Sequence, residues 1–446
     1  MSFNYSRVAI TWLAVTLAAL SGCGDVNVTT GAGGSGSGSS ATTTLATGPD
    51  TCVPIDDGDP CTEDFCLDGG PTHGPLPGGA CSVVGHCDNA GVCVGATCAA
   101  LGFSSKTFPT GAGGPVSVVV ADLNADGFVD LAVARITASD VAVMLNKGDG
   151  SFALPKHYQV NNGPTAVTAA DLDGDGAIDL ITSNALGNDT SILKNNGDGT
   201  FKKKLDYAAG ANPSSLVVVD VDGDGALDLV VANFDDSTVT VRLSLGPVVP
   251  DFGAATAYPV GAGPQAVVVA DFDGDNRPDL AVASLTSNDV SVLLNLGNGT
   301  FAAAVSYAAG IGPRAALVAD LNADGKVDLA VANALSGDVS VFLNQGKGTF
   351  APAVTYPTAL DANAIAAADL DNDGQIDLAV TSFQSTDVSV LLNLGQGTFK
   401  AKLSFPVGSQ PYSVAAADLD GDGWSDLAVV NSQGQNVSVL LNTCSP

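Results

Sequence analysis

The sequence predicts an all-β fold, a seven-bladed β-propeller that follows a small disulfide-rich N-terminal domain. The first observation is an acidic motif, "DLDGDGAID" in its second copy, that occurs seven times at intervals of 49 residues, with one interval of 51. The second is that each repeat consists of four short apolar stretches separated by Gly, Asn and Asp, the pattern of one propeller blade. The third is that no part of the repeat region shows a helical period. The copies begin at Asp122, Asp171, Asp220, Asp271, Asp320, Asp369 and Asp418.

The charge of the chain is unevenly distributed. The 446 residues carry a formal net charge of −31, yet 46% of them are hydrophobic. The acidic residues are therefore concentrated in particular places, unlike those of a disordered acidic tail. Only 16 residues are Lys or Arg and we find no basic stripe, so we expect no nucleic-acid partner. Cations are the more natural ligands.

Residues 1–22 have the features of a signal peptide. Arg7 precedes an apolar stretch from Val8 to Leu20, which is too short to span a bilayer but suits a signal-peptide core. The sequence "LSGC" that ends at Cys23 resembles the lipobox of bacterial lipoproteins, in which the cysteine is acylated. We therefore expect a bacterial envelope protein, facing the periplasm or the cell surface, whose only membrane contact is this lipid. The alternative is an ordinary signal peptide followed by a chance cysteine.

Two segments separate the expected anchor from the repeats. Residues 23–51 are rich in Gly, Ser, Thr and Ala, which predicts a flexible tether. Residues 52–98 form a second segment with six cysteines between positions 52 and 93 and few apolar residues, so disulfides have to stabilise it. We expect three internal disulfides. A zinc site is the alternative, although the segment has no Cys-x2-Cys pair.

The repeat region, residues 99–446, has matching ends. The last repeat stops after its third strand, and residues 102–111 resemble a fourth strand with no three before it. Joining them completes the seventh blade from both ends of the chain. The repeat that contains Asn295 and Phe301 has an expected turn of five residues between its third and fourth strands, and superposing this turn on the ends places Cys98 beside Cys444. We therefore predict a disulfide between them, unless Cys98 pairs within the small domain.

The acidic loops have the composition of a calcium site. Each supplies Asp at position 1, Asp or Asn at position 3, and Asp at positions 5 and 9, and alternating hard oxygen ligands suit Ca²⁺. Position 6 is Gly in six loops and Asn276 in the fourth, residues that accept a left-handed backbone at a sharp turn. Position 7 varies freely, as expected if only its carbonyl is used.

We therefore expect about seven Ca²⁺ ions in β-hairpin loops. The expected ligands are Asp122, Asn124, Asp126 and Asp130 in the first loop; Asp171, Asp173, Asp175 and Asp179 in the second; Asp220, Asp222, Asp224 and Asp228 in the third; Asp271, Asp273, Asp275 and Asp279 in the fourth; Asp320, Asn322, Asp324 and Asp328 in the fifth; Asp369, Asp371, Asp373 and Asp377 in the sixth; and Asp418, Asp420, Asp422 and Asp426 in the seventh. The alternatives are turns that bind nothing, catalytic carboxylates and Mg²⁺.

The repeats resemble a known family. A Gly-Pro start ("GAGP", Gly261 to Pro264), the acidic loop, and "GTF" followed by Tyr are similar to FG-GAP and VCBS-type repeats, including those of the integrin α-subunit propeller. The resemblance covers residues 101–444. It implies a seven-bladed propeller with calcium in the loops between the first and second strands. The sixth repeat departs from the pattern, because "DANA" replaces Gly-Pro.

The resemblance also implies a ligand face opposite the calcium loops. This face is formed by the turns that enter the first strand and those that join the second and third strands. The inner ring would be Val116, Thr165, Ser214, Gln265, Arg314, Ala364 and Tyr412, and the outer loops would include Arg135, Phe234, Asp235, Asp236 and Asn288. Arg314 and Tyr412 are the first candidates for ligand contact, because a cation and an aromatic residue differ from a ring of otherwise small residues. Gln265 and Phe234 are further candidates.

The expected function is that of an envelope-anchored binding or adhesion module for a protein or carbohydrate ligand. The propeller has one histidine, His157, no cysteine nucleophile and no Glu, since Glu63 is the only one in the chain. These residues offer no evident catalytic set, and whether the protein is an enzyme stays open. A calcium-assisted polysaccharide lyase, with Lys or Arg as base, is the alternative with chemistry, and a passive envelope scaffold is the alternative without it.

Overall fold

The computed structural model describes residues 101–246 and 251–443, together with four short strands nearer the N-terminus. These four strands are β1 (Thr62–Leu67), β2 (Gly70–Pro75), β3 (His86–Cys87) and β4 (Cys93–Val94). β1 pairs with β2 and β3 pairs with β4, both antiparallel. The predicted signal peptide, the lipid at Cys23, the tether and the disulfide between Cys98 and Cys444 lie outside the described residues.

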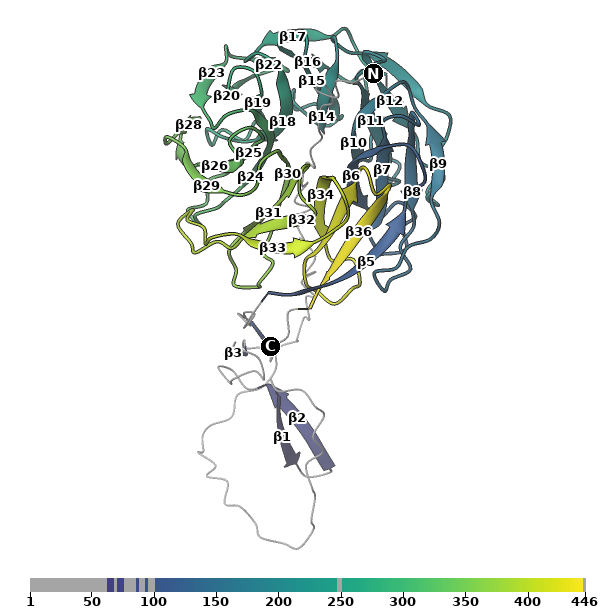
Figure 1. Cartoon of the computed structure of the whole chain (residues 1–446), viewed down its shortest axis with the longest axis vertical. Coiled ribbons are helices and arrows are strands. Elements are labelled where there is room, and N and C mark those ends of the chain that lie inside the picture. The colour runs from purple at the N-terminus through teal and green to yellow at the C-terminus, as the bar shows by residue number, and fades with distance from the viewer. Residues whose placement is uncertain are drawn as a thin grey trace, which may run out of the picture. The chain divides into compact units, whose positions relative to one another are not determined.

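Residues 101–443 form seven four-stranded antiparallel sheets arranged as the blades of a propeller, as predicted (Figure 1). Blade 1 is β6 (Pro115–Ala121), β7 (Asp130–Arg135), β8 (Asp140–Met144) and β9 (Lys156–Gln159); blade 2 is β10 (Pro164–Ala170), β11 (Asp179–Asn184), β12 (Asp189–Leu193) and β13 (Leu205–Ala208); blade 3 is β14 (Pro213–Val219), β15 (Asp228–Asn233), β16 (Thr238–Arg242) and β17 (Thr256–Pro259); blade 4 is β18 (Pro264–Ala270), β19 (Asp279–Ser284), β20 (Asp289–Leu293) and β23 (Val305–Ala308). Blade 5 is β24 (Pro313–Ala319), β25 (Asp328–Asn333), β26 (Asp338–Phe342) and β29 (Val354–Pro357); blade 6 is β30 (Ala362–Ala368), β31 (Asp377–Ser382), β32 (Asp387–Leu391) and β33 (Leu403–Pro406); blade 7 is β34 (Pro411–Ala417), β35 (Asp426–Asn431), β36 (Asn436–Asn442) and β5 (Phe103–Pro109).

The ring closes in blade 7, where both ends of the propeller meet. β5 comes from the N-terminal side and pairs with β36 from Asn436 opposite Pro109 to Asn442 opposite Phe103. The Thr443 N–H extends this ladder by donating to the Gly102 carbonyl at 2.9 Å. The first strand of each blade contacts the first strand of the next, and β34 contacts β6. The predicted joining of the two ends is therefore confirmed.

Burial decreases from the inner strands to the outer strand of each blade. The second strand is completely buried in all seven blades, whereas the fourth is exposed at all but one position in six blades and at all but two in blade 7. Val, Ala and Leu dominate the inner strands because both faces of each sheet pack against neighbouring blades. The partly buried position of the fourth strand is aromatic and lies against a Phe of the next blade. The rings of Tyr158 and Phe201, for example, are 5.1 Å apart between centroids.

The connection from the third to the fourth strand differs from the expected turn of five residues. In blade 4, residues 294–304 lie between β20 and β23, and they contain a small hairpin of β21 (Asn295–Gly297) and β22 (Thr300–Phe301). Blade 5 has the same hairpin in β27 (Asn344–Gly346) and β28 (Thr349–Phe350). The expected turn was wrong because the "GNGTF" segment folds back on itself before the fourth strand begins.

Candidate functional site

The seven acidic loops join the first and second strands of the blades. Position 1 is the residue directly after the first strand, and position 9 is the first residue of the second strand, in every blade. Because successive blades share this topology, all seven loops lie on one face, which we call the acidic face. The hairpins that follow the third strands lie on the same face, since antiparallel strands alternate in direction.

Two positions in each loop have a left-handed backbone. Position 6 has φ between 64° at Asn276 and 89° at Gly127 in all seven loops, as predicted. Position 4 is also left-handed in every loop, which was not predicted, and Ala occupies it in two loops. Ala125 and Ala323 have φ of 58° and 59°, a conformation that costs an L-residue free energy.

The carboxylates at positions 1 and 5 shape the loop. In the fifth loop, Asp320 Oδ1 accepts from the Asp324 N–H at 3.2 Å and Oδ2 accepts from the Gly325 N–H at 2.8 Å. Asp324 Oδ1 accepts from the Lys326 N–H at 2.9 Å, and the same bond from position 7 to position 5 occurs in all seven loops. These are the bonds of an Asx-rich turn. Each carboxylate keeps further lone pairs, so turn formation and ion binding are compatible.

The carboxylate at position 9 is buried in every blade, and in all blades but the second both of its oxygens accept main-chain N–H groups. In blade 6, Asp377 Oδ1 accepts from the Asn393 N–H at 2.8 Å and Oδ2 accepts from the Leu370 N–H at 3.0 Å. Burial raises the pKa of Asp377 to about 7, and it raises the pKa of Asp426 to the same value. In the other five blades burial raises the position 9 pKa to about 6. The negative charge of this residue is therefore costly unless a cation lies beside it.

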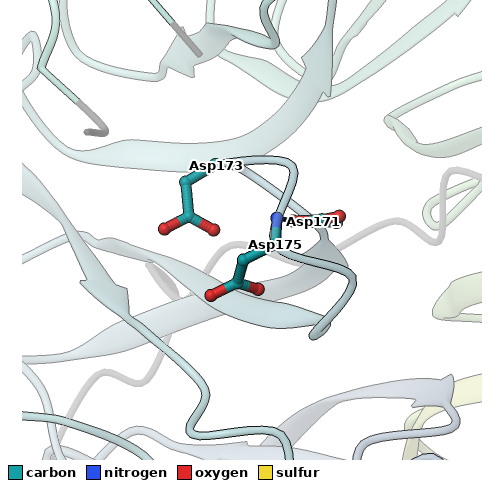
Figure 2. Close-up of side chains that lie close together, drawn as sticks. All are labelled: Asp171, Asp173 and Asp175. Atoms are coloured by element: carbon teal, nitrogen blue, oxygen red, sulfur yellow. Dashed lines mark hydrogen bonds between the residues drawn. The ribbon is translucent and has the colours of Figure 1, made fainter. Parts of the chain in front are cut away.

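Five loops bring three carboxylates together, with one oxygen of each within 4.8 Å of the others. In four of them the set is positions 1, 3 and 9: Asp220, Asp222 and Asp228; Asp271, Asp273 and Asp279; Asp369, Asp371 and Asp377; and Asp418, Asp420 and Asp426. In the second loop the set is Asp171, Asp173 and Asp175, which project from one tight curl (Figure 2). These clusters could bind metal ions. In the first and fifth loops position 3 is Asn, and its side chain offers an amide oxygen instead.

The residues fit a hard cation. Asp371 Oδ1 is buried and has no hydrogen-bond partner within residues 101–246 and 251–443. Asp173 Oδ1 and Asp179 Oδ2 also lack such a partner in the second loop, although there the other oxygen of Asp173 pairs with the Lys194 ammonium. An unpaired buried carboxylate oxygen is costly, and a bound cation would satisfy it. Calcium accepts six to eight oxygens in irregular geometry, which this set of Asp, Asn and main-chain oxygens can supply.

An asparagine at the end of the third strand joins neighbouring blades at this face. Asn393 donates from Nδ2 to the Leu321 carbonyl of blade 5 at 2.9 Å and to the Ile376 carbonyl of its own loop at 3.0 Å. Asn146 makes the corresponding bond from blade 1 to the Leu419 carbonyl of blade 7. Six blades have this Asn, and blade 3 has Ser244. Sequence reasoning missed this clamp, although the recurring "LN" at the end of the third strand marks it.

The inner ring on the opposite face consists of the residues at a β-bulge in each first strand. The ladder shifts between Pro313 and Ala315 and at the equivalent place in every blade, which sets Arg314 in the bulge. By this register the blade 6 member is Asn363, not Ala364 as expected. Ala364 pairs in the ladder with Thr381. The error arose because "DANA" has no Gly-Pro with which to align it.

Arg314 and Tyr412, the first candidates for ligand contact, interact with each other, and Arg314 also pairs with Asp361. Arg314 donates to Asp361 Oδ1 at 3.3 Å and to the Tyr412 hydroxyl at 3.4 Å, and its guanidinium lies 5.8 Å from the centre of the Tyr412 ring. Asp361 is the first residue of "DANA", so the departure of repeat 6 supplies the counter-charge for Arg314. Tyr412 and Gln265 are buried and are therefore not presented to solvent, while Phe234 is half-buried beside Gly263.

The outer loops of the same face contain both paired and exposed groups. Arg135 is buried and forms an ion pair with Asp140 at 2.5 Å, so it is not an exposed contact as expected. Asp235, Asp236 and Asn288 are exposed; the last two also accept main-chain bonds, from the Ala211 and Gly312 N–H groups respectively. Four large apolar side chains are exposed on this face: Leu186, Ile311, Leu335 and Leu360.

A separate hollow lies on the outer side of blades 1 and 2. It has a volume of about 300 Å³, and His157, Tyr158 and Gln159 of β9 line one side of it. Lys202, Lys203 and Lys204 line the other side, with Leu193 and Phe201. Sequence reasoning did not single out this place.

Comparison with known proteins identifies the family. Six overlapping stretches match the FG-GAP-like repeat, over residues 122–182, 171–231, 220–282, 271–331, 320–380 and 369–429. The chain belongs to the FG-GAP-like repeat family. No curated protein matches this FG-GAP-like protein. Within its described residues, no helix is long and apolar enough to span a bilayer.

Solved structures share the fold of this FG-GAP-like protein. A catalytically inactive virginiamycin B lyase from Staphylococcus aureus with quinupristin is 13% identical, with a TM-score of 0.52, and the match covers 76% of this chain and 99% of that one. BBS1N in complex with ARL6DN is also 13% identical, with a TM-score of 0.53 and coverage of 76% and 95%. A lectin from Agrocybe aegerita that recognises non-reducing terminal N-acetylglucosamine is 22% identical, with a TM-score of 0.49 and coverage of 84% and 91%. At such identities the likeness to the first two structures concerns the fold alone.

Proposed function

We propose that this FG-GAP-like protein is a calcium-stabilised binding module of the cell envelope, anchored by a lipid on Cys23. The face opposite the acidic loops would contact a protein or carbohydrate ligand. One observation supports this division most strongly. The acidic face repeats nearly the same side chains in seven blades, whereas the turns between the second and third strands on the opposite face differ from blade to blade, as in "ITASD", "ALGND" and "FDDST" of the first three blades. Repetition suits a structural task and variation suits recognition of one ligand.

Calcium is the ion that the acidic face suits best. The loops combine clustered carboxylates, unpaired buried oxygens and position 9 residues whose pKa burial has raised. At a dissociation constant near 10⁻⁴ M, in the range of extracellular calcium modules, 1 mM calcium would stabilise the fold by about 1.4 kcal/mol per site. Several such sites together approach the whole stability of an ordinary domain.

The proposed ligand face combines a fixed charge pair with exposed apolar groups. Ile311, Leu335 and Leu360 lie in adjoining turns of blades 5 and 6, since the Leu335 N–H donates to the Ile311 carbonyl at 3.0 Å and Gly337 abuts the backbone of Leu360. Arg314 and Asp361 belong to the same two blades. Exposed apolar side chains beside a polar pair are typical of recognition surfaces.

The test is a screen of the full chain without its lipid on glycan and protein arrays, in 1 mM calcium and in EGTA. We expect calcium-dependent retention on one class of ligand. The double variant L335D/L360D should lose this retention. The matched control, L296D/L394D, changes two leucines that are equally exposed on the acidic face and should keep it. Retention that survives L335D/L360D would refute the assignment of the face, and absence of any retention would refute the binding function.

A second candidate is a polysaccharide lyase that acts at the hollow of blades 1 and 2. The hollow places His157 beside three lysines. Burial and the nearby Arg135 charge lower the pKa of His157, so its imidazole is neutral at pH 7 and could accept a proton. Incubating the protein with the arrayed polysaccharides and measuring new unsaturated ends tests this. Turnover that is lost in H157A would favour the enzyme, and no turnover would exclude it for those substrates.

A further inference from the structure

The second acidic loop differs from the other six in one contact, because a lysine that follows the third strand of its blade forms an enclosed ion pair with the position 3 carboxylate. The residue before the clamp position is Leu in six blades and Lys194 in blade 2. The six leucines are Leu145, Leu243, Leu294, Leu343, Leu392 and Leu441. Lys194 belongs to the repeat directly before blade 3, and blade 3 also departs from the common pattern. It has Ser244 in place of the clamp Asn and two additional residues in its hairpin.

The leucines and the lysine take different directions. Leu294 lies against Gly348 in the hairpin of the next blade, and Leu343 lies against Gly397 in the same way. Lys194 instead reaches the acidic loop of its own blade, where its ammonium forms a hydrogen-bonded ion pair with Asp173. The Lys194 side chain is 17% exposed and that of Asp173 is 7% exposed. This pair is therefore largely enclosed.

The carboxylates of the second loop are arranged around this ammonium differently from those of the other loops. In the third, fourth, sixth and seventh loops the converging oxygens come from positions 1, 3 and 9. In the second loop they come from positions 1, 3 and 5 (Figure 2), and Asp179 at position 9 is not among them. A divalent ion bound to Asp173 would lie a few ångströms from the Lys194 charge, and like charges at that distance repel, the more so because the Lys194 and Asp173 side chains are largely enclosed.

Two other loops contain basic side chains, but these do not enter the loop. Arg277 and Lys326 stand at position 7 and pair with the position 5 carboxylates, Asp275 and Asp324. Their side chains are 45% and 43% exposed. They can move into solvent when an ion binds, because water replaces the partner at little cost. They therefore serve as matched controls for Lys194.

We propose that the Lys194 ammonium occupies the second loop in place of a divalent ion, so that the propeller binds calcium in its other six loops. This inference rests on the calcium part of the proposed function. The ammonium neutralises one of the loop's carboxylates at all calcium concentrations. The second loop therefore keeps its shape when the other loops lose their ions.

The test counts the calcium ions bound by the full chain, by equilibrium dialysis at 1 mM free calcium and by native mass spectrometry. We expect six ions for the natural protein and one more for K194L, which installs the residue of the other blades. The control K326L should leave the count unchanged. Equal counts for the natural protein and K194L would overturn the proposal. A natural protein that binds none would refute calcium binding itself, which is a distinguishable result.

A second pair of variants tests the proposal if K194L does not fold. D173A removes the position 3 oxygen from the second loop, and D371A removes it from the sixth. We expect D371A to bind one ion fewer and D173A to bind as many as the natural protein. A loss of one ion in D173A would show that the second loop binds calcium and would overturn the proposal.

Discussion

Replacing Asp377 by asparagine should stabilise the protein more without calcium than with it. Asp377 is completely buried and accepts the Asn393 and Leu370 N–H groups. Burial raises its pKa from 3.8 to about 7. Its folded pKa thus exceeds its unfolded pKa, so its contribution to stability is fully present below pH 3.8 and is lost as the pH rises through 7.

The magnitude without metal follows from that shift. About three pKa units at about 1.36 kcal/mol each amount to ~4 kcal/mol lost from the folded state at pH 8. The variant removes this charge and keeps one acceptor oxygen, but its amide group would face an N–H donor, at a cost of about 1–3 kcal/mol. In EGTA at pH 8 we therefore expect Asp377→Asn to raise the free energy of unfolding by ~1–3 kcal/mol.

Calcium should remove most of this advantage. At a calcium concentration about ten times the dissociation constant, a bound ion stabilises the natural protein by about 1.4 kcal/mol, and this figure already includes the relief of the buried charge. We expect the neutral amide to gain little from calcium in this loop. In 1 mM calcium at pH 8 the advantage of the variant should therefore fall by about 1.4 kcal/mol, to roughly 0–1.5 kcal/mol.

The assay is urea denaturation of both proteins at pH 8 in EGTA and in 1 mM calcium. The control is Asp338→Asn on the opposite face, where Asp338 accepts from Asn333 and Ser336 side chains. Its effect should be the same in both buffers. If Asp377→Asn destabilised the protein equally in both buffers, the carboxylate would serve only as an acceptor of main-chain hydrogen bonds, and our account of the acidic face would be wrong.

Four further changes test other parts of the structure. In EGTA the free energy of unfolding should fall as the pH rises from about 4 to 7, because the position 9 aspartates have a raised pKa in the folded state; calcium should flatten this trend, and urea denaturation at pH 5 and 8 measures it. Asn393→Ala should lose about 2–3 kcal/mol, since it removes three side-chain hydrogen bonds; a loss below about 0.5 kcal/mol in the same assay would contradict the clamp. Ala323→Gly should raise the free energy of unfolding by about 0.5–1 kcal/mol, and the melting temperature with it, because it relieves the strain of a φ of 59°; a lower melting temperature would argue against strain there. Arg135→Met should cost about 3–5 kcal/mol by leaving Asp140 buried without its partner, and adding Asp140→Leu should recover most of the loss.

The repeat pattern was sufficient to predict the fold but not the contacts between blades. The strand order, the acidic loops between first and second strands and the completion of blade 7 all follow from features that recur every 49 residues. The Asn393 clamp was missed because its carbonyl partner, Leu321, lies 72 residues away in another blade. The period of the repeat carries no information on which donors and acceptors meet across the boundary between two blades.

The ligand face was harder to predict for two physical reasons. A β-bulge shifts the register at the start of each first strand. In blade 6 no Gly-Pro marks the position of this bulge, so sequence reasoning assigned Ala364 to the inner ring where the structure has Asn363. Burial also depends on packing that the residue type does not reveal. Tyr412 stands out among small neighbours in the sequence, yet it lies in the core with Arg314 across its ring.

The pairing of β5 with β36 makes assembly of the ring depend on the completion of the chain. β5 is synthesised more than 320 residues before its partner, so until the chain is complete it remains an unpaired edge that could nucleate association with another copy. A chain cut before residue 436 would expose such edges permanently. Truncated products should therefore be prone to exchange strands and aggregate. In the uncut chain, β36 pairs with β5 and leaves no such edge unpaired in blade 7.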